Sequence, residues 1–120
     1  MSTTKRIILA DDDPGILDAI RILLEFEGYQ VTCVAAGEKL LTLETDLPHL
    51  ILLDIWMSGI DGRDICRQLK QKENTRKLPI ILISASKDIE NSAIAAGADD
   101  FVSKPFEMDH LIAKIEQYIL

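Results

Sequence analysis

The amino-acid sequence predicts an α/β domain with a central parallel sheet. Three short apolar runs, at residues 7–10, 50–53 and 80–83, contain no polar break, which is typical of strands buried on both faces. Stretches with apolar residues three and four positions apart separate these runs, and that spacing is typical of amphipathic helices. Strands that alternate with helices favour parallel pairing with right-handed crossovers.

The first half of the chain predicts three strands and two helices. The strands are expected at residues 6–10, 29–34 and 49–54, and the helices at 14–27 and 37–46. Pro14 suits the first position of the earlier helix, Asp13 its cap, and Gly28 its end.

The second half predicts two more strands and three more helices. The strands are expected at residues 79–83 and 100–103, and the helices at 63–72, 88–96 and 107–119. Asp88 can cap the middle helix and Gly97 can end it. Residues 55–62 contain two glycines and are expected to form a loop.

Five strands alternating with five helices fit the flavodoxin-like strand order 2-1-3-4-5. In this (βα)5 arrangement helices cover both faces of a five-stranded parallel sheet, which gives a three-layer sandwich. The sequence has no internal repeat, low-complexity tract or linker, so residues 1–120 are expected to form a single domain.

The composition narrows the classes of function. Thirteen basic and twenty acidic residues give a formal net charge of −7, which disfavours binding to nucleic acid or to an anionic membrane. No apolar run approaches the ~20 residues that span a bilayer, and the N-terminus has no signal-peptide pattern, so a cytoplasmic location is expected. Cys33 and Cys66 lack the spacing of a zinc or redox motif and are expected to be reduced thiols.

Carboxylates follow two strands that are neighbours in this strand order. Asp11 and Asp12 come after the first strand, and Asp54 ends the third. The carboxyl ends of parallel strands share one edge and adjacent strands lie ~4.8 Å apart, so we expect these side chains to lie close together. Such carboxylates repel one another unless a cation lies among them. A set of oxygen ligands without His or Cys favours Mg²⁺.

Two more polar residues are expected at the same edge. Ser84 ends the fourth strand and Lys104 follows the fifth. A hydroxyl and an ammonium at this edge would hold the oxygens of a transferred phosphoryl group. Asp54 would then be the nucleophile, because a carboxylate can accept a phosphoryl group as an acyl phosphate.

In these features the chain resembles the receiver domain of two-component response regulators, of the chemotaxis-regulator type. The resemblance covers essentially all 120 residues. The matching segments are residues 7–14 (IILADDDP), 52–62 (LLDIWMSGIDG), 80–85 (IILISA) and 97–106 (GADDFVSKPF).

The resemblance implies which residues hold the metal and accept the phosphoryl group. Asp54 corresponds to the phosphoacceptor, and Asp11 and Asp12 correspond to the acidic pair that helps to hold Mg²⁺. Asp54 itself and the backbone carbonyl of Trp56 complete the implied metal ligands.

The resemblance also implies the residues of the switch. Ser84 and Lys104 correspond to the residues that contact the phosphoryl group. Phe101 corresponds to the aromatic residue that turns inward together with Ser84. The peptide bond between Lys104 and Pro105 is usually cis in this family, although only ~5–6% of X-Pro bonds in folded proteins are cis.

The function implied by the resemblance is a phosphorylation switch. A phosphohistidine on a sensor histidine kinase or a phosphotransfer protein would donate its phosphoryl group to Asp54 with Mg²⁺ bound. The change would repack the face formed by the fourth helix, the fifth strand and the fifth helix, which would bind a downstream effector or a second copy. The domain would catalyse its own phosphorylation and dephosphorylation without being a turnover enzyme.

Two alternatives remain open. A phosphatase of the haloacid dehalogenase type would use Asp11 as nucleophile, but Gly15 stands where that family favours Thr, the chain is too short for a cap domain, and Asp54 would have no role. The other alternative is a receiver-like adaptor that is not phosphorylated, which the intact set of acidic residues disfavours.

Trp56 and Ser58 depart from the family pattern. Ser58 stands where proline is usual, and Trp56 is bulkier than the common occupant of its position. Either only the backbone of Trp56 matters, or the indole overhangs the site and slows the water that hydrolyses the acyl phosphate.

Overall fold

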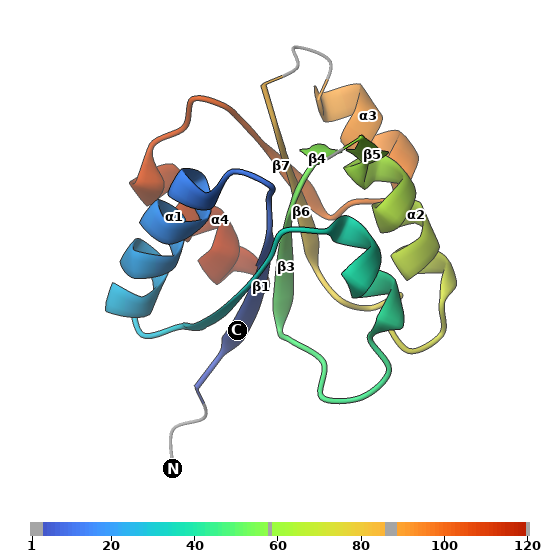
Figure 1. The fold of residues 1–120 in the computed structure, drawn as a ribbon, viewed down its shortest axis with the longest axis horizontal. Helices are drawn as coiled ribbons and strands as arrows, with labels where there is room; N and C mark the ends of the chain where they lie inside the picture. Colours follow the sequence, from blue (N-terminus) through green and yellow to red (C-terminus); the bar gives the residue numbers. More distant parts are fainter. Residues whose placement is uncertain (1–3, 58, 86–88, 120) are drawn as a thin grey trace.

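The computed structural model describes residues 4–57, 59–85 and 89–119, and these form the predicted parallel sheet (Figure 1). The sheet order is β2-β1-β3-β6-β7, and every neighbouring pair is parallel. These strands are β1 (Arg6–Ala10), β2 (Gln30–Val34), β3 (Leu50–Asp54), β6 (Ile80–Ser84) and β7 (Asp100–Ser103). Counted along the chain, the order of these five strands is 2-1-3-4-5, which confirms the prediction.

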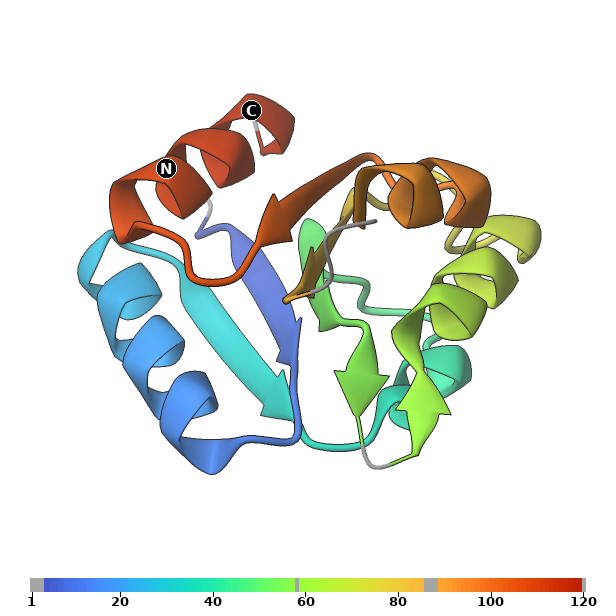
Figure 2. The ribbon, with the colours of Figure 1, turned by 90° about the horizontal axis from the view of Figure 1, so that it is seen from above.

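Helices cover both faces of the sheet. Seen from above, α1 (Pro14–Phe26) and α4 (Met108–Tyr118) lie on one face (Figure 2). The other face carries η1 (Gly37–Thr42), α2 (Gly62–Gln71) and α3 (Ile89–Ala96). Each face has its own apolar core, so the molecule is the predicted three-layer sandwich.

The central strands are anchored by burial on both faces. All five residues of β3 and all five of β6 are buried, as their unbroken apolar runs predict. Leu50 and Leu52 pack into the core beneath α1 and α4, whereas Ile51 and Leu53 pack into the core beneath α2 and α3. Burying each such side chain contributes ~1.5–3 kcal/mol. This burial fixes the position of Asp54, the last residue of β3.

The ends of α1 are as predicted. The Asp13 carboxylate accepts hydrogen bonds from the backbone N–H groups of Gly15 (2.9 Å) and Ile16 (3.3 Å), and Pro14 occupies the first turn. Gly28, at φ 98°, follows the helix in the left-handed region that only glycine adopts without strain. The other predicted cap, Asp88, lies outside the described residues.

The helix predicted at residues 37–46 was wrong in type and length. The chain forms only the short 3₁₀ helix η1 there. The Thr42 hydroxyl donates to the Lys39 carbonyl at 2.7 Å, and the Leu43 N–H donates to the Leu40 carbonyl, three residues back. Local bonds of this kind compete with the α-helical pattern.

The loop predicted at residues 55–62 also needs correction. It contains a small antiparallel hairpin of β4 (Trp56–Met57) and β5 (Ile60–Asp61), in which Trp56 pairs with Asp61 and Met57 with Ile60. Gly59, at φ 80°, supplies the turn. Ser58 lies outside the described residues.

Two expectations drawn from composition concern the thiols and the membrane. Cys33 and Cys66 are free cysteines, and Cys66 is buried. In the part of the chain that the structure describes, no helix has the length and apolar character needed to cross a membrane.

Gly62 marks a close approach between the start of α2 and the end of β3. A Cβ added to Gly62 would collide with the carbonyl oxygen of Asp54 and would lie 3.0 Å from the Cα of Ile55. Both are backbone atoms, so neither can move aside without displacing the residue that ends β3.

The substitution Gly62→Ala is expected to lower the free energy of unfolding by about 3 kcal/mol, the upper end of typical overpacking losses. The matched control is Gly15→Ala, whose added Cβ would meet only the Asp13 side chain, at 3.3 Å. That variant should change stability by less than about 1 kcal/mol. Urea unfolding followed by circular dichroism measures both, and equally small effects would contradict the close approach.

Candidate functional site

The carboxyl edge of the sheet brings Asp11, Asp12 and Asp54 together. Strands β1 and β3 are neighbours, and Ala10 pairs with Leu53, so the next residue of each segment, Asp11 and Asp54, lies beside the other. One carboxylate oxygen from each of the three residues lies within 4.8 Å of the others. Asp11 and Asp54 are buried, and Asp12 is exposed. The predicted cluster of carboxylates is therefore present.

Lys104 supplies positive charge to this cluster. Its Nζ lies 3.4 Å from Oδ2 of Asp11 and 3.5 Å from Oδ1 of Asp54. These distances are long for hydrogen bonds, so the ammonium is shared loosely by two buried carboxylates. The Lys104 N–H donates to the Ser84 carbonyl at 2.8 Å, which holds the segment after β7 beside β6. The Lys104–Pro105 peptide bond is cis, as the resemblance implied.

Ser84 lies at the same edge, at the end of the next strand. It is buried, and it follows Ile83, the residue of β6 that pairs with Asp54. In the pairing of β6 with β7, Ser84 lies opposite Ser103. The structure thus gathers every polar residue that the sequence predicted for this edge.

The charges around Asp54 are out of balance. Burial is the main cause that raises the pKa of the Asp54 carboxyl from its ordinary value of 3.8 to about 6. The nearby Asp11 carboxylate raises this pKa further, and the Lys104 ammonium opposes the shift without cancelling it. A cation among these oxygens would relieve the excess of negative charge, and the all-oxygen donor set suits a hard divalent ion.

Trp56, two residues after Asp54, begins the hairpin strand β4. The Gly62 N–H donates to the Ile55 carbonyl, and the Ile55 N–H donates to the Ile83 carbonyl of β6, so Ile55 connects the hairpin to the main sheet. Trp56 pairs with Asp61 across the hairpin.

The indole of Trp56 is 60% exposed and meets a residue that the sequence did not single out. The guanidinium carbon of Arg63 lies 5.3 Å from the centroid of the indole ring. No sequence pattern indicates this contact, since Trp56 and Arg63 belong to different elements that approach only in the folded chain.

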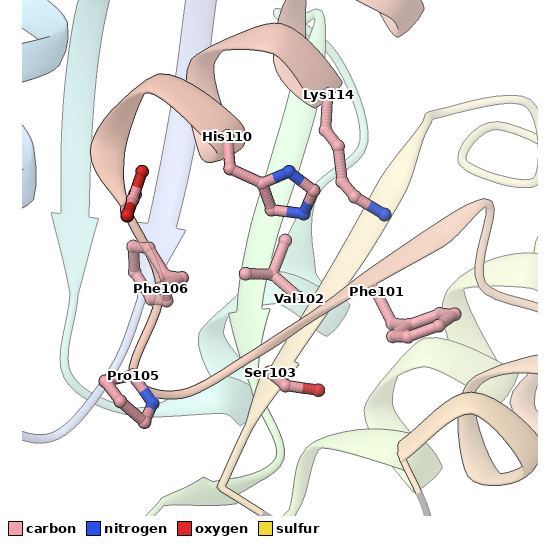
Figure 3. Close-up of a pocket in the computed structure, with 8 residues that line it drawn as sticks. Phe101, Val102, Ser103, Pro105, Phe106, His110 and Lys114 are labelled. Atoms are coloured by element: carbon pink, nitrogen blue, oxygen red, sulfur yellow. The ribbon is translucent and has the colours of Figure 1, made fainter.

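Phe101 lies on β7 and is half-buried. The ammonium of Lys114, on α4, lies 5.0 Å from the centroid of the Phe101 ring and 2.7 Å from the Asp100 carboxylate. Figure 3 shows Lys114 and His110 extending from α4 toward β7. These two residues line a pocket of about 460 Å³ together with Phe101. The aromatic residue predicted for the switch therefore has one side against a cation.

Comparison with known proteins identifies the family. The family model for the response regulator receiver domain matches residues 7–116. The chain belongs to the response regulator receiver family. Receivers of this family are signalling domains and, in general, not turnover enzymes, so the phosphatase alternative is not favoured.

Individual receiver proteins agree with this assignment. The chain is 35% identical over 113 residues to the DNA-binding dual master transcriptional regulator RpaA of Synechocystis sp.. The aligned region covers 92% of this chain and 47% of RpaA. A solved response regulator from Chloroflexus aurantiacus superimposes with a TM-score of 0.90 at 30% identity, with 98% of both chains covered. The receiver domain of the sensor histidine kinase PA1611 from Pseudomonas aeruginosa was solved with magnesium in its active site cleft. It superimposes with a TM-score of 0.86 at 31% identity, with 98% of both chains covered. The chain spans about half the length of the curated relatives it matches.

The raised pKa of Asp54 gives the receiver a predictable pH dependence. Below pH 3.8 the carboxyl is protonated in both the folded and the unfolded chain. Between 3.8 and about 6 the folded chain binds the proton more tightly, and above about 6 the folded chain carries the full penalty of a buried charge. Asp54 therefore lowers stability as pH rises through this window.

The substitution Asp54→Asn is expected to raise the free energy of unfolding of the metal-free protein by about 1–2 kcal/mol at pH ~8 and by little at pH ~4. The amide occupies the space of the carboxyl without its charge. Chemical denaturation in the presence of a chelator measures both values. A gain of equal size at the two pH values, or a loss at the higher one, would contradict the charge imbalance.

Proposed function

We propose that Asp54 accepts a phosphoryl group from the phosphohistidine of a sensor histidine kinase or phosphotransfer protein. One observation supports this proposal most strongly. Two buried carboxylates, Asp11 and Asp54, share the ammonium of Lys104 at the carboxyl edge of neighbouring strands. Buried acids that crowd in this way are costly to stability, and such groups concentrate at functional sites.

The residues that would hold Mg²⁺ are Asp11, Asp12, Asp54 and the backbone carbonyl of Trp56. Their oxygens suit this ion, which prefers oxygen ligands and retains some of its waters. When bound, Mg²⁺ would neutralise negative charge on the carboxylates and on the incoming phosphoryl group. The magnesium ion in the active site cleft of the P. aeruginosa receiver supports Mg²⁺ as the cation here.

The chemical step belongs to Asp54. A carboxylate oxygen of Asp54 attacks phosphorus, and the bond between phosphorus and the histidine nitrogen breaks, with the electron pair remaining on the imidazole. The product is an acyl phosphate, and its hydrolysis by water returns the free carboxylate. The Lys104 ammonium and the Ser84 hydroxyl donate hydrogen bonds to the phosphoryl oxygens, where they act at a site largely shielded from solvent.

The added charge drives the switch. The Ser84 hydroxyl turns toward the phosphoryl group, and Phe101 turns inward behind it. In doing so Phe101 gives up its contact with the Lys114 ammonium. The face formed by α3, β7 and α4 then repacks and changes its affinity for a downstream effector or a second copy.

The partners in this proposal are proteins. The net charge of −7 disfavours contact with nucleic acid or an anionic membrane by this chain. The DNA binding in the name of RpaA is a property of that longer protein. A cytoplasmic setting, where histidine kinases present their phosphohistidine, fits the proposal.

Incubation with acetyl phosphate and Mg²⁺ is expected to add one phosphoryl group to the wild-type chain, as measured by intact mass. Acetyl phosphate replaces the phosphohistidine as donor, because the receiver catalyses the transfer itself. Asp54→Asn should add none, and a chelator should abolish the gain.

Two neighbouring aspartates provide a matched comparison. Asp12→Asn removes a proposed metal ligand and should strongly reduce the labelling. Asp13→Asn should label like the wild type, because Asp13 caps α1 and asparagine caps equally well. An unlabelled wild-type chain, or equal labelling of Asp54→Asn, would overturn the proposal.

A further inference from the structure

We propose that Arg63 is a positioning residue that fixes the Trp56–Asp61 hairpin relative to Asp54 and ties it to helix α3. The inference rests on the proposed function, since it concerns the loop that carries the proposed carbonyl ligand of Mg²⁺. It adds to that function a residue outside the set of carboxylates, Ser84, Lys104 and Phe101.

Arg63 uses its whole guanidinium group. Its Nε lies 2.9 Å and 3.1 Å from the two carboxylate oxygens of Asp61, and its Nη2 lies 2.7 Å from Oδ2. The guanidinium carbon lies 5.3 Å from the centroid of the Trp56 ring, and Nη1 donates to Oγ of Ser92 on α3 at 3.1 Å. A planar fork of donors can make these three contacts at once, whereas a lysine ammonium cannot.

The hairpin depends on contacts of this kind for its order. Each of its strands has only two residues, and a two-stranded hairpin is at best marginally stable on its own. Arg63 contacts both strands, since Trp56 begins β4 and Asp61 ends β5. The side chain therefore clamps the open end of the hairpin, opposite the turn at Gly59.

This clamp lies next to the end of β3. Gly62 precedes Arg63, and its backbone packs against the carbonyl of Asp54 while its N–H donates to the Ile55 carbonyl. The Asp61 carboxylate also accepts from the backbone N–H of Arg63 at 2.9 Å and so caps α2. A change in the Arg63 contacts would thus be felt directly at the backbone between Asp54 and Trp56.

The bond to Ser92 extends the clamp to α3. Helix α3 belongs to the face proposed to repack, and Ser92 lies 29 positions along the chain from Arg63. This link connects α3 to the hairpin that carries the proposed metal ligand Trp56. In the proposed switch, Ser84 and Phe101 respond instead to the phosphoryl group. Strands β6 and β7, which carry Ser84 and Phe101, also contact α3.

The test compares Arg63→Met with Arg67→Met, and its first measurement is Mg²⁺ affinity by calorimetry. Both arginines lie on α2, and each pairs with an aspartate of the same segment, but Arg67 pairs with Asp64 on the exposed side of the helix. Arg63→Met should bind Mg²⁺ roughly tenfold more weakly, as is typical when a residue that orients a metal ligand is lost. Arg67→Met should not weaken binding.

The direction of the change separates positioning from simple charge. Loss of a positive charge beside an acidic site would strengthen Mg²⁺ binding if Arg63 acted only through its field. Arg63→Lys keeps the positive charge but loses the planar set of guanidinium donors, so its Mg²⁺ affinity should remain lower than that of the wild type. Full recovery of affinity in Arg63→Lys, or affinity in Arg63→Met equal to or tighter than in the wild type, would overturn the inference.

Amide hydrogen exchange of the metal-free protein gives a second readout that needs neither Mg²⁺ nor phosphorylation. Arg63→Met should accelerate exchange in peptides that cover the hairpin and α3, and Arg67→Met should leave both unchanged. Unchanged exchange in Arg63→Met would overturn the role of Arg63 even if Asp54 is phosphorylated normally. A wild-type chain that binds no Mg²⁺ would overturn the proposed metal site instead, and the exchange comparison would still decide the clamp.

Discussion

The constraint on which the rest of the structure depends is the sharing of the Lys104 ammonium by two buried carboxylates, with a third carboxylate close to both. One carboxylate oxygen from each of Asp11, Asp12 and Asp54 lies within 4.8 Å of the others, and the Lys104 ammonium offsets only part of their charge. The raised pKa of Asp54 shows that this arrangement opposes folding near neutral pH. The fully buried strands β3 and β6 offset the penalty, because their apolar residues supply much of the core.

Three contacts hold the backbone of this edge in place. Gly62 lets α2 start against the end of β3, and Asp13 caps α1 directly after the acidic pair. The backbone N–H of Lys104 donates a hydrogen bond to the carbonyl of Ser84, the last residue of β6. A site that must hold a cation and then a phosphoryl group needs this rigidity, because its charged groups act only if they are already in place.

Periodicity and parallel topology were enough to predict the sheet and the composition of its carboxyl edge. Unbroken apolar runs located the strands, and the shared edge of parallel strands predicted that Asp11, Asp54 and Lys104 lie together. The errors lie where short-range competition decides the outcome, as with the Thr42 hydroxyl in η1 and the two-residue strands of the hairpin. The contacts of Arg63 could not be predicted, because they join segments whose approach depends on the completed fold.

The identity of the acceptor can be measured directly by reducing the phosphorylated protein with borohydride, which converts an aspartyl phosphate to homoserine, and sequencing the tryptic peptides by mass spectrometry. We expect homoserine at position 54, within the peptide that ends at Arg63, and aspartate at positions 11 and 12. Homoserine in place of Asp11 or Asp12 would contradict the assignment of Asp54 and would favour a nucleophile after the first strand. Absence of homoserine from every peptide of a phosphorylated sample would exclude an acyl phosphate altogether.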